Sequence, residues 1–474
     1  MSTARHKVVL YNPRAVFFTM PLALLAVGSH LDPSRYEVVI IDGRLTEDPE
    51  RAVREALEGA LCLGVTVLTG APISDALRVS RAAKHAHPHL PVIWGGWHPS
   101  MFGIECLAEP AVDVTVQGQG EATFAELVER LAAGESLEGC SGCVVRRADG
   151  TLIRNPPREL LPLESFRAHD YGLIPVERYF ELKGKRQLDY ISSQGCNFRC
   201  AFCSDPFVYG RKWVGLEPRN VATALAELWR RHRFTDVNFQ DETFFTRRER
   251  VQVLAEQLLE AQLRISWAAT MRADQGVRLP TQLWQLARRS GLRRLLVGVE
   301  SGDDAMLKRI KKDITLAQVF QTARQMRELG IKGTFPFIVG FPGESDASVR
   351  ATLACIKRLR AMSADFEAPI FYFKPYPGSA IVLEAVQEGF RLPDNLAEWS
   401  QFDYVAGLPG PWVSDSKYQL IERFKFFQEL AWQRASAGWS VLQRLARLRC
   451  ERDEYRWPIE MRVHNWLMPR ERLS

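Results

Sequence analysis

The sequence predicts an α/β protein with three successive parts: a Rossmann-like (flavodoxin-like) domain, a partial (β/α)6 barrel and a helical C-terminal region. Three observations predict this order. Short apolar runs alternate with helical stretches from residue 7 to about 150, and a second alternating series extends from Leu188 to Phe373. From about residue 396 the composition changes to Trp, Phe and Arg at helical spacing. Strands that alternate with helices indicate parallel sheets covered by helices.

The first series predicts a doubly wound sheet. Its expected strands are Lys7–Tyr11, Tyr36–Asp42, Cys62–Leu68, Pro91–Trp94 and Val112–Val116, and its expected helices are Pro21–Leu31, Pro49–Leu57, Ser74–Ala86 and Ala122–Leu131. Ligands of such sheets bind outside the carboxyl ends of the strands. Glycines at those ends allow the backbone to approach a bulky ligand.

The second series predicts six βα units, too few to require closure into a full barrel. The expected strands are Leu188–Ser192, Val237–Phe239, Ile265–Ala268, Leu295–Val299, Gly333–Val339 and Ala368–Phe373. The amphipathic helices between them are Val221–Arg231, Arg248–Ala261, Thr281–Ser290, Leu316–Leu329 and Ser345–Met362. The site of such a unit lies at the carboxyl ends of the strands.

We place the domain boundaries at the composition changes. The first domain spans 1–150, a linker rich in proline and mixed charge spans 151–185, the barrel spans 186–395 and the helical region spans 396–474. Two apolar stripes mark the last region: Phe424, Phe427, Leu430 and Ala431, then Trp439, Leu442, Leu445 and Leu448. Such stripes usually form core or cover a barrel mouth. The alternative is contact with a membrane surface, because Arg444, Arg447 and Arg449 flank the second stripe.

Three cysteines, Cys196, Cys200 and Cys203, stand in a CxxxCxxC run after the first barrel strand. This spacing can direct three thiolates at one iron–sulfur cube and leave the fourth iron without a protein ligand. A structural zinc site would need four ligands, and no second Cys or His pair follows closely. The run resembles the signature of radical S-adenosylmethionine (SAM) enzymes. The resemblance implies a [4Fe–4S] cluster whose free iron binds SAM and whose reduced form cleaves it to a radical.

Segments after the next four strands resemble the SAM-contacting elements of this superfamily. By that resemblance, Asp241 and Glu242 face the amino group of SAM, and Glu300 and Ser301 face its ribose or carboxylate. Arg272 faces an anionic group, and Phe202 and the segment from Gly340 to Gly343 border the adenine. Carboxylates accept hydrogen bonds from ammonium and hydroxyl groups, and arginine binds carboxylate in a fork. The alternative is that polar residues at strand ends only cap helices.

Two elements of the first domain resemble those of cobalamin-binding Rossmann-like domains. Thr66-Val67-Leu68 matches the Ser-x-Leu element, and Gly95-Gly96 matches the glycine pair that admits the benzimidazole. The loop from Asn12 to Phe18 lacks the usual Asp and His, so the resemblance implies no histidine below cobalt. His98 lies near the cofactor tail or is a turn histidine satisfied by the backbone. The expected cobalamin contacts are Asn12, Asp42, Thr66, Leu68, Gly95, Gly96, His98, Gly118 and Glu121. An ordinary flavodoxin-like domain is the alternative.

A second cysteine pair, Cys140-Ser141-Gly142-Cys143, has the spacing of a redox or metal pair. The residues after it indicate a strand and a tight turn, and no partner His or Cys lies near in the sequence. We interpret the pair as a coincidence within a hairpin.

The combined resemblance, over about residues 7 to 390, implies a cobalamin-dependent radical SAM enzyme. We expect methylation of an unactivated carbon in a natural-product, lipid or tetrapyrrole-type substrate, with one SAM as methyl source and a second as radical source. A cyclase or rearrangement enzyme without methyl transfer is the second hypothesis. A cobalamin-binding sensor with a structural cluster is the third. A methylthiotransferase of transfer RNA is disfavoured, because three further cluster cysteines and a basic C-terminal module are lacking.

Composition bounds the compartment and the partners. The net charge of +6 is spread over 62 basic and 56 acidic residues, so nucleic-acid binding is not expected. No apolar run is long enough to span a bilayer, and the polar N-terminus carries no evident secretory signal. Unpaired cysteines fit a reducing compartment, so we expect a cytoplasmic protein. The expected partners are a large apolar small molecule and a reductase such as flavodoxin or ferredoxin, with possible peripheral membrane contact.

Overall fold

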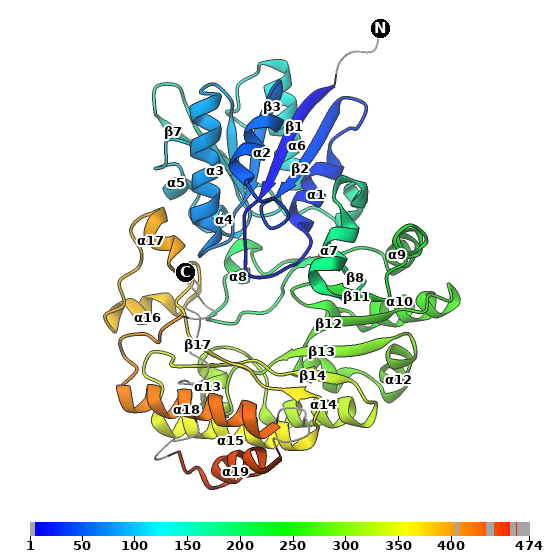
Figure 1. Cartoon of the computed structure of the whole chain (residues 1–474), viewed down its shortest axis with the longest axis vertical. Helices are drawn as coiled ribbons and strands as arrows, with labels where there is room; N and C mark the ends of the chain where they lie inside the picture. The colour runs from blue at the N-terminus through cyan, green and yellow to red at the C-terminus, as the bar shows by residue number, and fades with distance from the viewer. Residues whose placement is uncertain (1–4, 403–406, 433–439, 456–460, 462–474) are drawn as a thin grey trace.

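In a computed structural model, the protein consists of two α/β units stacked along its long axis (Figure 1). The structure describes residues 5–402, 407–432, 440–455 and 461. The N-terminal sheet lies at one end and the barrel strands with their helices lie at the other (Figure 1). The carboxyl ends of both sets of strands supply residues to one cavity between them. The predicted cobalamin site therefore faces the barrel across this cavity, whereas the residues predicted to contact the cluster and SAM do not line it.

The N-terminal sheet has the strand order β2-β1-β3-β4-β5-β6-β7. Its first five strands are parallel and β6 and β7 form an antiparallel hairpin at the edge. The order 2-1-3-4-5 is flavodoxin-like, which confirms the predicted fold class. The strands are β1 His6–Asn12, β2 Tyr36–Asp42, β3 Ala60–Thr66, β4 Val92–Gly95, β5 Val114–Val116, β6 Cys143–Arg146 and β7 Leu152–Arg154.

Helices cover both faces of this sheet, which explains why its strands are continuous apolar runs. Helices α1 and α6 pack on one face, with Leu24 and Leu127 in its core, and α2 and α3 pack on the other, with Val53 and Ile73 in its core. The helices are α1 Leu22–His30, α2 Pro49–Ala56, α3 Pro72–Ala86, α4 Trp97–Met101, α5 Gly103–Cys106 and α6 Glu121–Ala133. The linker forms η1 Leu163–Ser165, η2 Tyr171–Leu173 and α7 Val176–Lys183.

The barrel sheet is open, parallel and six-stranded, in the order β16-β14-β13-β12-β11-β8. The expected strand Gly333–Val339 is split into β14 and β15 at Pro336, which lacks the N–H that a ladder needs. The expected strand Ala368–Phe373 is present as β17, and Pro369 separates it from a further short strand, β16. Strands β15 and β17 pair with each other. The strands are β8 Gln187–Tyr190, β11 Asp236–Phe239, β12 Ser266–Arg272, β13 Leu292–Gly298, β14 Lys332–Thr334, β15 Phe337–Val339, β16 Phe366–Glu367 and β17 Ile370–Tyr372.

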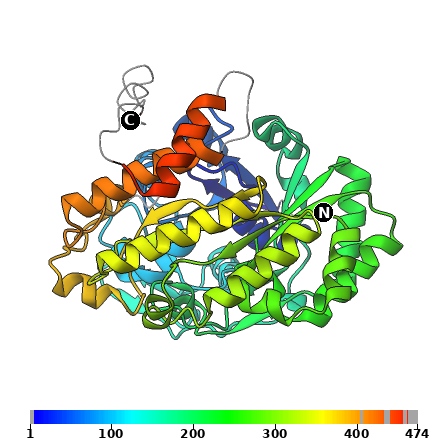
Figure 2. The same cartoon turned by 90° about the horizontal axis from the view of Figure 1, so that it is seen from below.

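The longer barrel helices lie on the outer face of this sheet, as the view from below shows (Figure 2), whereas the short α8 lies between the two halves beside α4 (Figure 1). Helix α14 begins with a capping box between Thr315 and Gln318, and Ser345 caps α15. The helices are α8 Asp205–Val208, α9 Pro218–His232, α10 Arg248–Glu260, α11 Ala273–Arg278, α12 Thr281–Arg289, α13 Asp304–Arg309, α14 Leu316–Glu328 and α15 Asp346–Met362, with η3 Phe244–Thr246.

The C-terminal region divides between the two halves of the molecule. Helix α17 packs on α3, whereas α18 and α19 lie beside α15 (Figure 1). In α18, Phe424, Phe427 and Ala431 are buried, as the first stripe predicts. The elements are α16 Val382–Gln387, α17 Leu396–Ser400, α18 Asp415–Trp432 and α19 Ser440–Arg452.

The second apolar stripe is not core, and the prediction that it packs inward is wrong. Leu442, Leu445 and Leu448 are 40%, 46% and 39% exposed. Instead, α19 buries its small residues Ala446 and Cys450, which allow it to lie close to α18. Trp439 falls outside the described residues. Within the described part of the chain, no helix combines the length and the apolar character that crossing a membrane requires.

Candidate functional site

The cysteine loop lies between two short antiparallel strands, β9 Ser193–Gly195 and β10 Trp213–Gly215. Gly195, directly before Cys196, has a φ of +82°, a backbone conformation that favours glycine. A Cβ there would lie 2.3 Å from the carbonyl oxygen of Lys212. Only glycine therefore fits at the point where the strand turns into the loop.

The loop is anchored to the barrel through its middle residue. The Ala201 N–H donates to the Ile310 carbonyl at 2.8 Å, and the Ala201 carbonyl accepts from the Ile381 N–H at 3.1 Å. At the loop surface, Arg199 forms an ion pair with Asp313 at 2.7 Å. These contacts connect the loop to the segments after β13 and β17.

The three loop thiols are half-buried. Burial raises the pKa of Cys196 to about 11 and, together with the nearby Asp205, raises the pKa of Cys203 well above its usual value. Metal binding to such thiols must displace protons. In the described part of the chain no three Cys, His, Asp or Glu side chains are grouped so as to hold a metal ion. An iron–sulfur cube makes a different demand, because each of its irons takes its own thiolate, and three thiols in one short loop fit that demand.

Arg272, at the end of β12, lies against this loop. Its Nη1 donates to Cys200 Sγ at 3.5 Å, and its guanidinium carbon lies 3.7 Å from the centre of the Phe198 ring. Nε donates to Asp274 at 3.0 Å and Nη2 to the Lys312 carbonyl. The sequence-based expectation for Arg272 was an anionic group of SAM. In the structure all three of its nitrogens have protein partners.

Asp241 and Glu242 follow β11, but their surroundings differ. Asp241 is buried and accepts hydrogen bonds from the Ser192 N–H at 2.8 Å and from the Ser192 and Ser193 hydroxyls. Glu242 Oε2 accepts from the Gly195 N–H at 3.2 Å. Desolvation, followed by the charge of Asp205, raises the pKa of Glu242 well above its usual value. Asp241 thus holds the strand before the loop, whereas Glu242 lies beside the loop itself.

Glu300 and Ser301 follow β13 and are also oriented differently. Glu300 has a φ of +72°, rare outside glycine, and its carboxylate accepts from Lys312 Nζ at 2.7 Å. Non-glycine residues in this region cost about 1–3 kcal/mol and occur mostly at functional sites. Ser301 is fully buried, with its hydroxyl 3.3 Å from that of Thr352 in α15. Ser301 thus contacts the helix behind the strand.

The glycine segment after β15 carries an acid that the sequence analysis did not assign to the site. Glu344 is buried and accepts from the N–H groups of Gly340 and Phe341 at 2.5 and 3.2 Å. Gly340 and Gly343 have φ values of +77° and +65°. The Phe341 ring lies edge-on to the Phe202 ring at 6.2 Å. Phe202 and the glycine segment therefore lie side by side.

A cavity of about 450 Å³ lies between the two sets of strand ends. Seven of the nine residues expected to contact cobalamin line it: Asn12, Thr66, Leu68, Gly95, Gly96, Gly118 and Glu121. Gly96 has a φ of +96°, and a Cβ there would lie 3.0 Å from Thr66 Oγ1. Such a turn needs glycine and keeps the floor of the cavity open.

Asp42 and His98 do not line the cavity. The Asp42 carboxylate is held by Arg44, by Asn12 and by the hydroxyl of Tyr179. His98 is fully buried, with Nδ1 3.1 Å from Thr69 Oγ1 and its ring packed against Trp399 of α17. Burial lowers the pKa of His98 to about 4, so it is neutral. The hydrogen-bond partner of His98 Nδ1 is therefore a side chain, and not the backbone that the turn interpretation expects.

Four residues of the barrel half also line the cavity: Gln194, Val208, Tyr209 and Gln240. Gln194 connects the two halves through two side-chain hydrogen bonds. Its Nε2 donates to Glu121 at 3.0 Å and its Oε1 accepts from Gln119 at 3.0 Å. Sequence reasoning missed Gln194. Its place two residues before Cys196 was the available signal.

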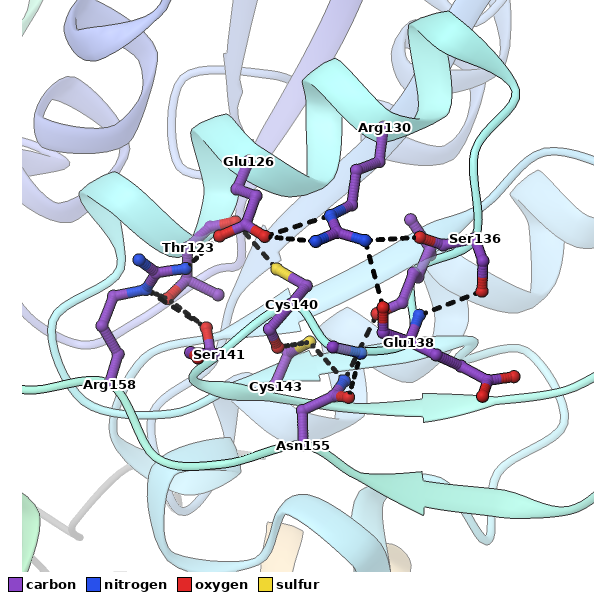
Figure 3. A network of polar contacts seen from close by, with 12 residues as sticks. Thr123, Glu126, Arg130, Ser136, Glu138, Cys140, Ser141, Cys143, Asn155 and Arg158 are labelled. Atoms are coloured by element: carbon purple, nitrogen blue, oxygen red, sulfur yellow. Dashed lines mark hydrogen bonds and ion pairs between the residues drawn. The ribbon is translucent and has the colours of Figure 1, made fainter.

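Cys140 and Cys143 are buried at the β6–β7 hairpin, against α6 (Figure 3). Cys143 Sγ donates to the Cys140 carbonyl at 3.1 Å and accepts from Asn155 Nδ2 at 3.3 Å, and Cys140 Sγ donates to the Thr123 carbonyl at 3.9 Å. Glu126 binds Arg130 and Arg158 beside them (Figure 3). The predicted hairpin is present. The Cys143 thiol has its partners within it, whereas the partner of the Cys140 thiol lies in α6.

Comparison with protein families identifies both halves. The radical SAM superfamily matches residues 190–356, and the B12 binding domain matches residues 10–128. An uncharacterised methyltransferase of Pyrococcus horikoshii is 28% identical over 83% of this chain and 85% of its own length. The anaerobic magnesium-protoporphyrin IX monomethyl ester cyclase of Synechocystis is 27% identical over 68% of this chain and 64% of its own length.

The fold has counterparts among solved structures. The radical SAM methyltransferase TsrM of Kitasatospora setae, with tryptophan and a SAM analogue bound, superposes with a TM-score of 0.71 at 18% identity, over 81% of this chain and 76% of that one. The cofactors that these two domains imply are a [4Fe–4S] cluster, SAM and cobalamin. Residues 190–356 are thus a radical SAM domain and residues 10–128 a B12-binding domain, the two domains of a cobalamin-dependent radical SAM enzyme.

Proposed function

We propose that the enzyme transfers a methyl group to an unactivated carbon of a natural-product, lipid or tetrapyrrole-type substrate. The observation that carries the proposal is the single cavity lined by both the cobalamin-binding strand ends and the barrel. Bound in this frame, the cluster and SAM supply radical cleavage of a C–H bond, and cobalamin supplies a methyl carrier. A substrate in this cavity would contact both domains. The similarity to a methyltransferase of Pyrococcus horikoshii supports the same reaction class.

We assign the following roles within this proposal. Cys196, Cys200 and Cys203 hold the cluster, and Glu242 and Glu300 bind the polar end of SAM. Phe202 and the segment Gly340 to Gly343 border the adenine. The seven cavity-lining residues of the first domain bind cobalamin. Asp241 and Ser301 keep the strand ends in place from behind. We retain the domain boundaries at 150, 185 and 395 as part of the proposal.

The co-products of SAM test the methyl transfer. Radical cleavage of SAM yields 5′-deoxyadenosine, and polar methyl donation yields S-adenosylhomocysteine, so the two products count the two uses of SAM separately. We expect both in about equal amounts per turnover, with the label of methyl-deuterated SAM in the product. Mass spectrometry of the quenched reaction measures all three.

A different co-product pattern would indicate the second candidate function. The similarity to the Synechocystis cyclase favours ring closure or rearrangement as that candidate. Such an enzyme would form 5′-deoxyadenosine without matching S-adenosylhomocysteine. A product that carries no deuterium would therefore reject methyl transfer.

A second prediction is that no histidine of the chain binds cobalt. The Asn12–Phe18 loop contains none, and His98 lies outside the cavity lining. Electron paramagnetic resonance of the cob(II)alamin form should be identical for protein made with ¹⁴N- and ¹⁵N-histidine. A splitting pattern that changes from triplet to doublet with the label would identify a histidine ligand. Nitrogen of the cofactor itself is unaffected by this label and serves as the internal control.

We also propose the partners and the compartment. The electron donor is a flavodoxin or ferredoxin, because the cluster needs single electrons. All nine cysteines are free thiols, which supports a reducing compartment such as the cytoplasm. The exposed leucines of α19 are the surface that peripheral membrane contact would use.

A further inference from the structure

Two charged side chains lie against sulfurs of the cysteine loop. Asp205 interacts with Cys203, and Arg272 approaches from β12, with Nη1 3.5 Å from Cys200 Sγ. The same guanidinium stacks on Phe198, two residues earlier in the loop, at 3.7 Å. Arginine can make both contacts at once because its guanidinium is planar, with donors at its edge. Arg272 thus combines a hydrogen bond to sulfur with a stacking contact.

The position of this charge is fixed by the remaining contacts of Arg272. Its side chain is 8% exposed and its other two nitrogens bond to Asp274 and to the Lys312 carbonyl. The backbone is held as well, since the Arg272 N–H donates to Gln275 Oε1 at 3.0 Å. A buried side chain with three partners has little freedom to turn toward another ligand. The guanidinium therefore stays beside Cys200.

The positive charge of Arg272 is only partly compensated. Asp274 binds Arg272 and also Arg278, so one carboxylate serves two guanidinium groups. A second cation, Lys312, is buried nearby and is paired with Glu300 at 2.7 Å. The charges of Arg272, Arg278 and Asp274 sum to +1. Asp313 also interacts with Arg272, but it is paired with Arg199, so that this pair adds no net charge.

We propose that Arg272 raises the reduction potential of the cluster through its contact with Cys200. It is a positioning residue, because it acts through that sulfur on the electron transfer that starts the reaction. The inference rests on the proposed cluster at Cys196, Cys200 and Cys203. Reduction adds one electron from a low-potential donor protein and transfers no atoms, so the cluster becomes more negative by one charge. Hydrogen bonds to cluster sulfur and nearby positive charge stabilise the more negative state. Arg272 therefore makes cluster reduction easier.

A redox titration of the reconstituted full-length protein, without SAM or substrate, tests this inference. Dithionite and redox mediators set the potential of the solution. Electron paramagnetic resonance then measures the amount of reduced cluster at each potential. We expect Arg272→Gln to lower the potential, so that the ratio of reduced to oxidised cluster at a fixed solution potential falls by about tenfold, or about 59 mV for one electron. The potential of Arg272→Lys should lie between those of the wild type and of Arg272→Gln. The matched control is Arg278→Gln on the same helix, which also loses a bond to Asp274 but does not touch the loop, and it should titrate nearer to wild type than Arg272→Gln does.

Two further variants keep the proposal falsifiable if Arg272→Gln loads no iron. Asp274→Asn removes the shared negative charge and should raise the potential, opposite to Arg272→Lys. A loaded Arg272→Gln protein with the wild-type potential, or unchanged potentials in both Arg272→Lys and Asp274→Asn, would overturn the role. Because SAM is absent, binding of its carboxylate cannot produce the shift. Failure of the wild-type protein to hold any cluster would instead reject the proposed function.

Discussion

Replacing Cys196, Cys200 and Cys203 together by alanine should reduce the iron content of the reconstituted protein from about four atoms per chain to near zero. The short loop supplies all the thiolates that the proposed cluster uses, so no partial site remains. The brown charge-transfer absorption and the formation of 5′-deoxyadenosine should disappear together. Iron assay and optical spectroscopy after anaerobic reconstitution measure the outcome.

The matched control replaces Cys140 and Cys143 by alanine. These thiols are buried in the edge hairpin, with partners in that hairpin and in α6, and they lie outside the proposed cluster site. The double variant should therefore keep its iron, although loss of the buried sulfur contacts lowers its melting temperature. Iron retained by the triple variant, or lost by the double variant alone, would contradict the assignment of the cluster.

Gly195→Ala should have the second largest effect, because this position combines two independent penalties. An L-residue at its φ of +82° costs about 1–2 kcal/mol. The added Cβ would also lie 2.3 Å from the Lys212 carbonyl oxygen, so β10 must move away from β9. The Glu242 contact to the Gly195 N–H shifts with the strand. We expect a lower melting temperature and a several-fold loss of bound iron.

Gly210→Ala is the control that separates the two penalties. Gly210 also has a positive φ, +57°, but a Cβ there would meet no atom within 4 Å. It should lower the melting temperature by the backbone penalty alone and leave iron binding intact. Equal iron loss in both variants would mean that the approach of Lys212 to Gly195 does not hold the loop.

The sequence predicted the elements well because their patterns are local. Periodicity and strand-end glycines located the five parallel strands of the first sheet and the barrel strands. Pro336, visible in the sequence, split one expected strand, because a missing N–H outweighs the apolar pattern around it. The stripe of Leu442, Leu445 and Leu448 was misjudged for another reason. Hydrophobicity favours burying leucine, but close packing of α19 on α18 selected Ala446 and Cys450.

The sequence predicted which residues belong to the site better than it predicted the contacts that those residues make. The cysteine run and the glycine turns identify themselves over a few residues. The partners of Arg272, Asp42 and His98 come from distant segments, at Cys200, Tyr179 and Trp399, and no local pattern encodes those meetings. A buried polar side chain takes whatever partner the fold supplies. Asp42 thereby became part of the contact between linker and sheet rather than part of the cavity.

The position of Gln194 has a consequence for engineering the enzyme. One side chain, two residues before Cys196, joins Gln119 and Glu121 of the first domain to the strand that enters the cysteine loop. The two domains are therefore not interchangeable modules. A chimera that takes its cobalamin-binding domain from a relative would need to bring residues that match Gln119 and Glu121. A library of such chimeras should be built with these two positions and position 194 varied as one unit.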